Sequence, residues 1–157
     1  MAVRHQVIER PPEDVWAVLC DGSKYSDWVV GTTDSYEREG TWPEVGSSIR
    51  YVVGLGPARF EGSTVVRRME RPRWLELEAK SGWAGSARIA IEVRPWGAGT
   101  LVIVDEHPLH GPGGRLHNTA FEAVIQLRHR RMLRKLAGVV EERPRREPVA
   151  PAVAGPV

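Results

Sequence analysis

The sequence predicts an α+β domain, built from an antiparallel sheet of about seven strands and a long C-terminal helix. Three observations predict it: six segments alternate polar and apolar residues with period two, a long amphipathic segment follows them, and one strand and two short helices precede them. The chain has 157 residues, of which 41% are hydrophobic and 27% charged. These values are typical of a single globular domain with one core.

The amino-terminal quarter predicts one strand and two short helices. Residues 3–9 form the strand, and Pro11-Pro12-Glu13-Asp14 opens a helix, because proline fits a first helical turn and carboxylates favour the positive end of the helix dipole. Asp21-Gly22-Ser23 ends that helix. A second helix over residues 24–29 carries Tyr25 and Trp28.

From residue 32 onward the pattern is typical of an antiparallel meander. The connections are short and rich in glycine or proline, so consecutive strands must pair as hairpins. We expect strands at residues 33–38, 48–54, 58–69, 73–80, 83–94 and 100–108.

A loop over residues 107–118 precedes the last helix, which we expect from Thr119 to about Glu142. Its apolar residues form one stripe at spacings of four, seven, four and three: Phe121, Ile125, Met132, Leu136 and Val139. The domain should therefore span residues 1–142. Residues 143–157 are rich in proline and poor in large apolar groups, so we expect a disordered tail.

The composition indicates the cellular compartment of the protein and argues against one class of partner. Cys20 is the only cysteine, which fits a reducing compartment, and no apolar run is long enough to cross a bilayer. The first residues carry no signal-peptide pattern, so we expect a cytoplasmic protein. Residues 115–157 carry nine basic and four acidic side chains. A segment with this charge could contact phosphates or anionic lipid, although such a segment is more often the solvated face of a helix. The basic residues lack interleaved aromatic residues, which argues against nucleic-acid binding.

Four local patterns, in this order, carry a family resemblance. They are Ile8-Glu-Arg-Pro-Pro-Glu-Asp-Val-Trp16-Ala-Val-Leu19, Tyr25-Ser-Asp-Trp28, Met69-Glu-Arg-Pro-Arg-Trp-Leu75, and Gly99-Thr100 opening a strand that ends in Asp105-Glu106. With the order of elements, they resemble the START/Bet v 1-like (helix-grip) superfamily, and within it the bacterial polyketide cyclase/dehydrase-like (SRPBCC) proteins.

The resemblance implies a curved sheet wrapped around the C-terminal helix, with a cavity between them for a hydrophobic small molecule. These patterns mostly encode architecture, so they identify the fold better than a reaction. The residues expected to line the cavity are Trp28, Tyr51, Phe60, Leu75, Leu77, Trp83, Ile89, Ile91, Val104, Phe121, Ile125 and His129. Ordinary core packing predicts the same apolar pattern, and a hydrogen-bonded core histidine is the alternative for His129.

Glu106 is the candidate catalytic residue. If Val102 and Val104 face the cavity, alternation places Glu106 there too, although Leu101 and Ile103 make the opposite face equally apolar. Burial would raise the pKa of an unpaired carboxyl, which suits a general acid or base. The alternative is a carboxylate at the rim or paired with arginine.

Three functions remain open at this point. The first is binding of a polyketide- or lipid-like molecule, the second an aromatase/cyclase or dehydratase with Glu106 as acid/base, and the third a lipid or membrane-surface protein. We expect no metal, because the spacing His107-x2-His110-x6-His117 matches no common ligand set. We expect no cofactor, and a monomer or weak homodimer.

Overall fold

The computed structural model describes residues 2–55, 57–80, 85–110 and 119–144, without the side chains of residues 2, 37, 38, 54, 55, 58 and 119–127. Several predictions therefore lie outside the described residues. They concern Trp83, the loop at 111–118, the side chains of Phe121 and Ile125, and the tail from residue 145.

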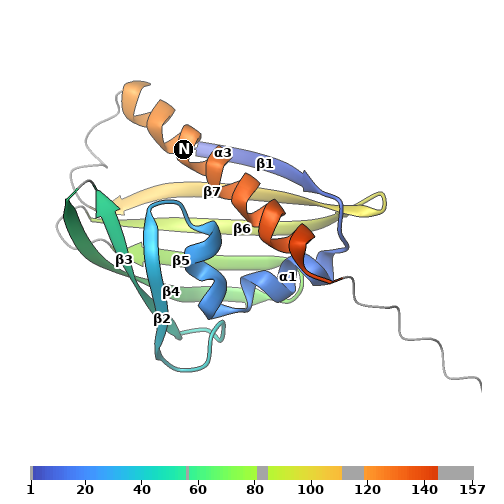
Figure 1. The fold of residues 1–157 in the computed structure, drawn as a ribbon, viewed down its shortest axis with the longest axis horizontal. Helices are drawn as coiled ribbons and strands as arrows, with labels where there is room; N and C mark the ends of the chain where they lie inside the picture. Colours follow the sequence, from blue (N-terminus) through green and yellow to red (C-terminus); the bar gives the residue numbers. More distant parts are fainter. Residues whose placement is uncertain (1, 56, 81–84, 111–118, 145–157) are drawn as a thin grey trace, which may run out of the picture.

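The elements follow the predicted order (Figure 1). They are β1 (Ala2–Ile8), α1 (Pro12–Leu19), a 3-10 turn (Gly22–Lys24), α2 (Tyr25–Trp28), β2 (Thr32–Glu39), β3 (Ser48–Leu55), β4 (Ala58–Glu70), β5 (Trp74–Lys80), β6 (Ser86–Trp96), β7 (Gly99–His110) and α3 (Thr119–Glu142).

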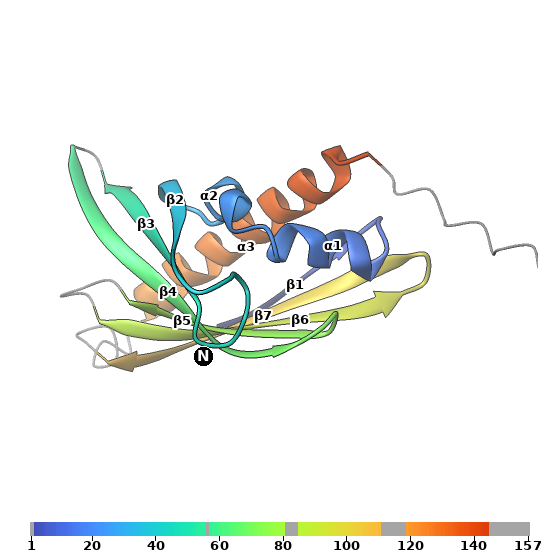
Figure 2. The same ribbon diagram turned by 90° about the horizontal axis from the view of Figure 1, so that it is seen from below.

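The strands form one antiparallel sheet in the order β1-β7-β6-β5-β4-β3-β2. Consecutive strands from β2 to β7 pair as hairpins, and β1 pairs with the last strand, β7. Figure 2 shows that the sheet is curved and that α1, α2 and α3 all lie on its concave side. This arrangement confirms the predicted fold class.

The concave face of the sheet, called the inner face below, carries the core. Along β7 the even-numbered residues 100–106 are buried and the odd-numbered ones are only half-buried. Cross-strand pairing extends this face from Val104 to Ile91 of β6 and on to Leu75 of β5. The sequence leaves open which face of β7 points inward. In the structure it is the face that carries Val102, Val104 and Glu106.

One end of α3 is fastened to the start of α1 by Arg10, whose side chain is buried. Its guanidinium donates to the backbone oxygens of Glu141 at 2.6 Å and Arg143 at 2.8 Å, and its Nη1 lies 3.4 Å from Oδ2 of Asp14. The last carbonyls of a helix have no partner within the helix. Arg10 satisfies two carbonyls there, and Asp14 balances its charge.

The β6–β7 hairpin packs against the same end. Thr100 donates its hydroxyl to the backbone oxygen of Arg10 at 2.7 Å. A Cβ on Gly99 would lie 2.5 Å from the backbone oxygen of Ile8, so only glycine allows β7 to begin this close to β1. The Gly99-Thr100 pattern therefore fixes the end of β1 against the start of β7.

Most strand bounds agree with the prediction to within one residue, but β6 begins at Ser86 rather than residue 83, and β6 and β7 each extend two residues beyond their predicted ends. β6 runs through Pro95, which pairs with Thr100, because the hairpin needs only a tight turn in which Gly97 adopts a φ of +57°. β7 extends to His110 rather than ending near residue 108, and a register shift at Ser86/Ala87 accompanies the pairing of Ala87 with Pro108. A proline lacks an N–H, but it is tolerated at such an irregularity.

Of the helices that the structure describes, none has the length and apolar character needed to cross a membrane.

Candidate functional site

A buried hydrogen bond joins the sheet to α3. Oε2 of Glu106, near the end of β7, lies 2.5 Å from Nε2 of His129, in the middle of α3. Glu106 is 8% exposed and His129 is 1% exposed. The sequence singles out both residues separately, and the structure brings them together across 23 positions of chain.

The pKa of Glu106 is shifted in the direction opposite to the one expected from the sequence. Burial by itself raises the pKa of this carboxyl, but the hydrogen bond from His129 and the positive charges of Arg128 and His129 outweigh it, so the pKa is lowered. The prediction of a raised pKa was wrong, because it treated the carboxylate as unpaired. Glu106 is therefore ionised at neutral pH.

An ionised carboxylate only accepts hydrogen bonds, so Nε2 of His129 carries the hydrogen of this bond. The other ring nitrogen, Nδ1, is buried and has no hydrogen-bond partner within the part of the chain that the structure describes. A carboxylate that fixes one nitrogen of an imidazole leaves the opposite nitrogen to exchange a proton or a hydrogen bond with another molecule.

A second buried polar group is the hydroxyl of Tyr25, a residue in a cluster of four aromatic side chains. The ring of Tyr25 stacks on Tyr51 with centroids 5.7 Å apart, and meets the edges of Trp28 at 5.4 Å and Trp42 at 6.0 Å. Its hydroxyl is hydrogen-bonded to Oγ1 of Thr64 at 2.7 Å. The cluster forms a rigid aromatic wall whose buried hydroxyl points to β4.

Burial and the neighbouring Tyr51 raise the pKa of Tyr25, so its hydroxyl stays neutral. Smaller effects on that pKa come from the charges of Arg128 and Glu106, which places the aromatic cluster in the same electrostatic environment as the Glu106–His129 pair. Tyr25 and Thr64 are absent from the sequence-derived site. Only the alternation of Thr64 with Phe60 and Gly62 along β4 hints that it faces inward.

Gly62 makes room for one of these rings. It pairs with Tyr51 across β3 and β4, and a Cβ at this position would lie 2.5 Å from Cε2 of the tyrosine. The ring of Tyr51 therefore lies flat over the backbone of β4, where any larger residue would displace it.

The residues expected to line the cavity face the interior wherever the structure describes their side chains in the sheet and α2. All of them are buried except Phe60. Exposed fractions are between 0% and 7% for Trp28, Tyr51, Leu75, Leu77, Ile89, Ile91 and Val104. Phe60 shares the inner face through its pairing with Val53, but it is 40% exposed. It lies toward the rim, beyond the aromatic cluster.

The polar residues around Glu106 do not gather into one site. Asp105 and His107 pair with each other at 2.8 Å through side chains that alternate to the outer face, and Ser86 pairs with His110 at 3.3 Å. Among the described residues, no group of three or more histidine, cysteine and acidic side chains is arranged to hold a metal ion.

Comparison with known proteins gives one family match. A family model described as polyketide cyclase / dehydrase and lipid transport matches residues 2–141. Among curated proteins, none matches the sequence of this chain.

Several solved structures share the fold. Ara h 8.0201 superposes with a TM-score of 0.73 at 10% identity, over 90% of this chain and 97% of that one. Protein CV1439 from Chromobacterium violaceum gives 0.69 at 16% identity, over 90% and 97%. DynU16, a protein of the dynemicin biosynthetic locus, gives 0.68 at 17% identity, over 90% of this chain and 47% of its own. At these identities the likeness shows the fold alone.

Proposed function

The chain belongs to the polyketide cyclase/dehydrase and lipid transport family, and on that premise we propose that it binds a polyketide- or lipid-like molecule on its inner face, beneath α3. The observation that carries the proposal is the buried Nδ1 of His129, which lacks a partner among the described residues. Buried polar atoms are rarely left unpaired, because each one costs about 1–3 kcal/mol. A bound ligand with a hydroxyl group that donates its hydrogen to Nδ1 would remove that cost.

The surroundings favour a mostly apolar ligand with few polar groups. Leu77 and Ile89 lie beside Glu106 across the sheet, and the aromatic wall of Tyr25 and Tyr51 faces the same interior. Sites for small molecules commonly combine such apolar walls with one or two polar groups that fix orientation. An aromatic or polyketone molecule has this distribution of groups. The placement of DynU16 in a biosynthetic locus is consistent with that class.

A second candidate function is proton transfer on such a ligand. The Glu106–His129 pair favours it, because the carboxylate holds the imidazole in one tautomer and one orientation. In this version Nδ1 of His129 accepts a proton from a carbon next to a ketone, as an aldol cyclisation or dehydration requires. Glu106, which the sequence nominates as the acid/base, is then a positioning residue and His129 is the catalytic one.

Binding is tested with Nile red, an uncharged probe whose fluorescence rises in apolar sites. Ile89→Trp fills the inner face next to Glu106, and Ile103→Trp adds the same ring to the outer face of the neighbouring strand β7. We expect saturable Nile red binding that Ile89→Trp weakens at least tenfold and Ile103→Trp leaves unchanged. Equal effects of the two variants, or no binding by the folded protein, would overturn the proposal.

Turnover is tested separately with the protein and the ligand that co-purifies from its native host, identified by native mass spectrometry. His129→Gln should keep binding but reduce the rate of any conversion by roughly 10²–10⁴, the usual contribution of a general base. Asp105→Asn changes a carboxylate on the opposite face of β7 and should leave the rate unchanged. Bound ligand that is never converted would leave binding as the function and exclude the enzyme.

A further inference from the structure

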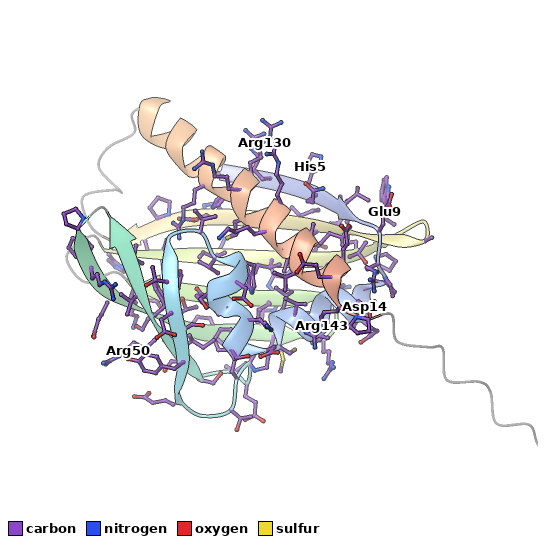
Figure 3. All side chains as sticks on the ribbon, in the orientation of Figure 1. His5, Glu9, Asp14, Arg50, Arg130 and Arg143 are labelled. Atoms are coloured by element: carbon purple, nitrogen blue, oxygen red, sulfur yellow. The ribbon has the colours of Figure 1, made fainter. Side chains whose placement is uncertain are left out.

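A polar cleft opens between the edge strand β1 and α3, away from the inner-face site. Its volume is about 300 Å³, and it is lined by Arg4, His5 and Gln6 from β1 and by Arg130, Leu133 and Arg134 from α3. Figure 3 shows His5 and Arg130 side by side at this edge of the molecule. Leu133 is 1% exposed, so the cleft has an apolar base beneath its basic rim.

The lining is positively charged and contains no carboxylate. Three of its six residues are arginines, and the remaining polar ones are a histidine and a glutamine. Within the ranges that the structure describes, neither Arg130 nor Arg134 forms an ion pair, although other arginines of the chain do. The two stand one turn apart on the same exposed face of α3, where like charges repel.

Such an arrangement costs stability unless an anion occupies it. A guanidinium presents its N–H groups as a planar fork that matches the oxygens of phosphate, and two such forks on one helix face favour an anion with more than one charge. A carboxylate needs only one fork. The cleft is also larger than a phosphate ion alone requires, which leaves space for an organic group or a second phosphate.

We propose that the cleft between β1 and α3 is a binding site for a phosphate-bearing molecule, a phosphate ester or diphosphate. This site is separate from the inner-face site, and its existence does not depend on the identity of the hydrophobic ligand. The excess of basic residues after position 114 has a specific use under this proposal: Arg130 and Arg134 bind the anion, whereas Arg131 and Lys135 form a solvated face.

The test compares two double variants with the same loss of charge. Arg130→Gln/Arg134→Gln removes two cations from the cleft, and Arg131→Gln/Lys135→Gln removes two with the same spacing from exposed positions of α3 outside it. Binding of inorganic pyrophosphate is measured by calorimetry. We expect one site per chain, a loss of affinity of at least about tenfold in the cleft variant, and a change below about twofold in the control.

The source of the phosphate is distinguished with vesicles of phosphatidylcholine, with and without phosphatidic acid. Binding of pyrophosphate identifies a soluble phosphate compound. Binding only to vesicles with phosphatidic acid, lost in the cleft variant and kept in the control, identifies a lipid headgroup. Equal weakening in both double variants would mean diffuse charge attraction and would overturn the proposal. Absence of saturable binding to both probes would overturn it as well.

Discussion

Two buried ionisable side chains differ in how completely they are hydrogen-bonded: Arg10, which lies against the carboxyl end of α3, and His129, which lies within α3. At the carboxyl end of the helix, Arg10 makes two hydrogen bonds to backbone oxygens and faces the carboxylate of Asp14. In the middle of the helix, His129 has one nitrogen bonded to Glu106 and the other without a partner among the described residues. The polar groups of the first region hold α3 in place, whereas under the proposed function the second region keeps a hydrogen-bonding position for another molecule.

We expect the largest loss of stability from a substitution at the carboxyl end of α3, where Arg10 is bound. Arg10→Met removes the guanidinium and leaves the buried Asp14 and two backbone oxygens at the end of α3 without it, so we expect the free energy of unfolding to fall by about 3–5 kcal/mol. Urea unfolding measures this. As a control, Arg73→Met removes an exposed arginine paired with Glu70 and should change stability by less than about 1 kcal/mol. Similar losses in both variants would remove the distinction between this end and the surface.

The next effect compares two histidine–carboxylate pairs on opposite faces of β7. His129→Leu leaves Glu106 buried without its partner, and we expect a loss of about 2–3 kcal/mol at neutral pH. His107→Leu breaks a pair whose side chains are about 30% exposed and should cost less than about 1 kcal/mol. Chemical unfolding of both variants measures these two losses of unfolding free energy. A loss in His107→Leu as large as that in His129→Leu would contradict the account.

Substitution of Gly62 tests the packing of the aromatic cluster near the Glu106–His129 pair. Gly62→Ala places a methyl group against the ring of Tyr51, so we expect a loss of about 1–3 kcal/mol and weaker Nile red binding as the ring shifts. Gly138→Ala makes the same change in α3, where nothing lies within 4 Å of the added carbon. It should be neutral or stabilising by up to about 1 kcal/mol. Thermal unfolding and probe titration of the two variants are the measurements.

The smallest effect is a change in pH dependence. The pKa of Glu106 is lower in the folded protein than its ordinary value of 4.5, so its contribution to stability is present above that value and is lost as pH falls through the folded pKa. In His129→Leu, only the charge of Arg128 still opposes burial, so we expect the pKa of Glu106 to rise above its ordinary value and stability to decline as pH rises through that value. Unfolding free energies between about pH 3 and pH 7 should therefore show slopes of opposite sign for this group. The same slope in both proteins would show that His129 does not control the carboxyl.

Most of the fold is predictable because its signals are local. Period-two alternation and short glycine- or proline-containing turns define the meander, and the stripe through Met132 and Leu136 defines the buried face of α3. The strand ends at Pro95 and Pro108 are harder to predict. A proline there is compatible with either a loop or an irregular pairing, and only the partner strand decides between them.

The site is predictable only in part, since its chemistry depends on contacts between distant segments. Glu106 and His129 each stand out in the sequence, but their contact depends on how α3 rotates and crosses β7. The direction of the pKa shift of Glu106 depends on that contact. For Thr64 and Gly62 the sequence shows only that they alternate on one face of β4, because their roles come from the tyrosines that reach them from α2 and β3.

The proposed function depends on Nδ1 of His129 being kept for a ligand. It is tested most directly by nitrogen NMR of histidine-labelled protein during titration with 1-naphthol, an apolar molecule with one hydroxyl, after naphthol is shown to displace Nile red. We predict that saturation with naphthol shifts the Nδ1 resonance of His129, whereas naphthalene, which lacks the hydroxyl, does not. An Nδ1 resonance that stays in place while naphthol displaces the probe would contradict the proposal.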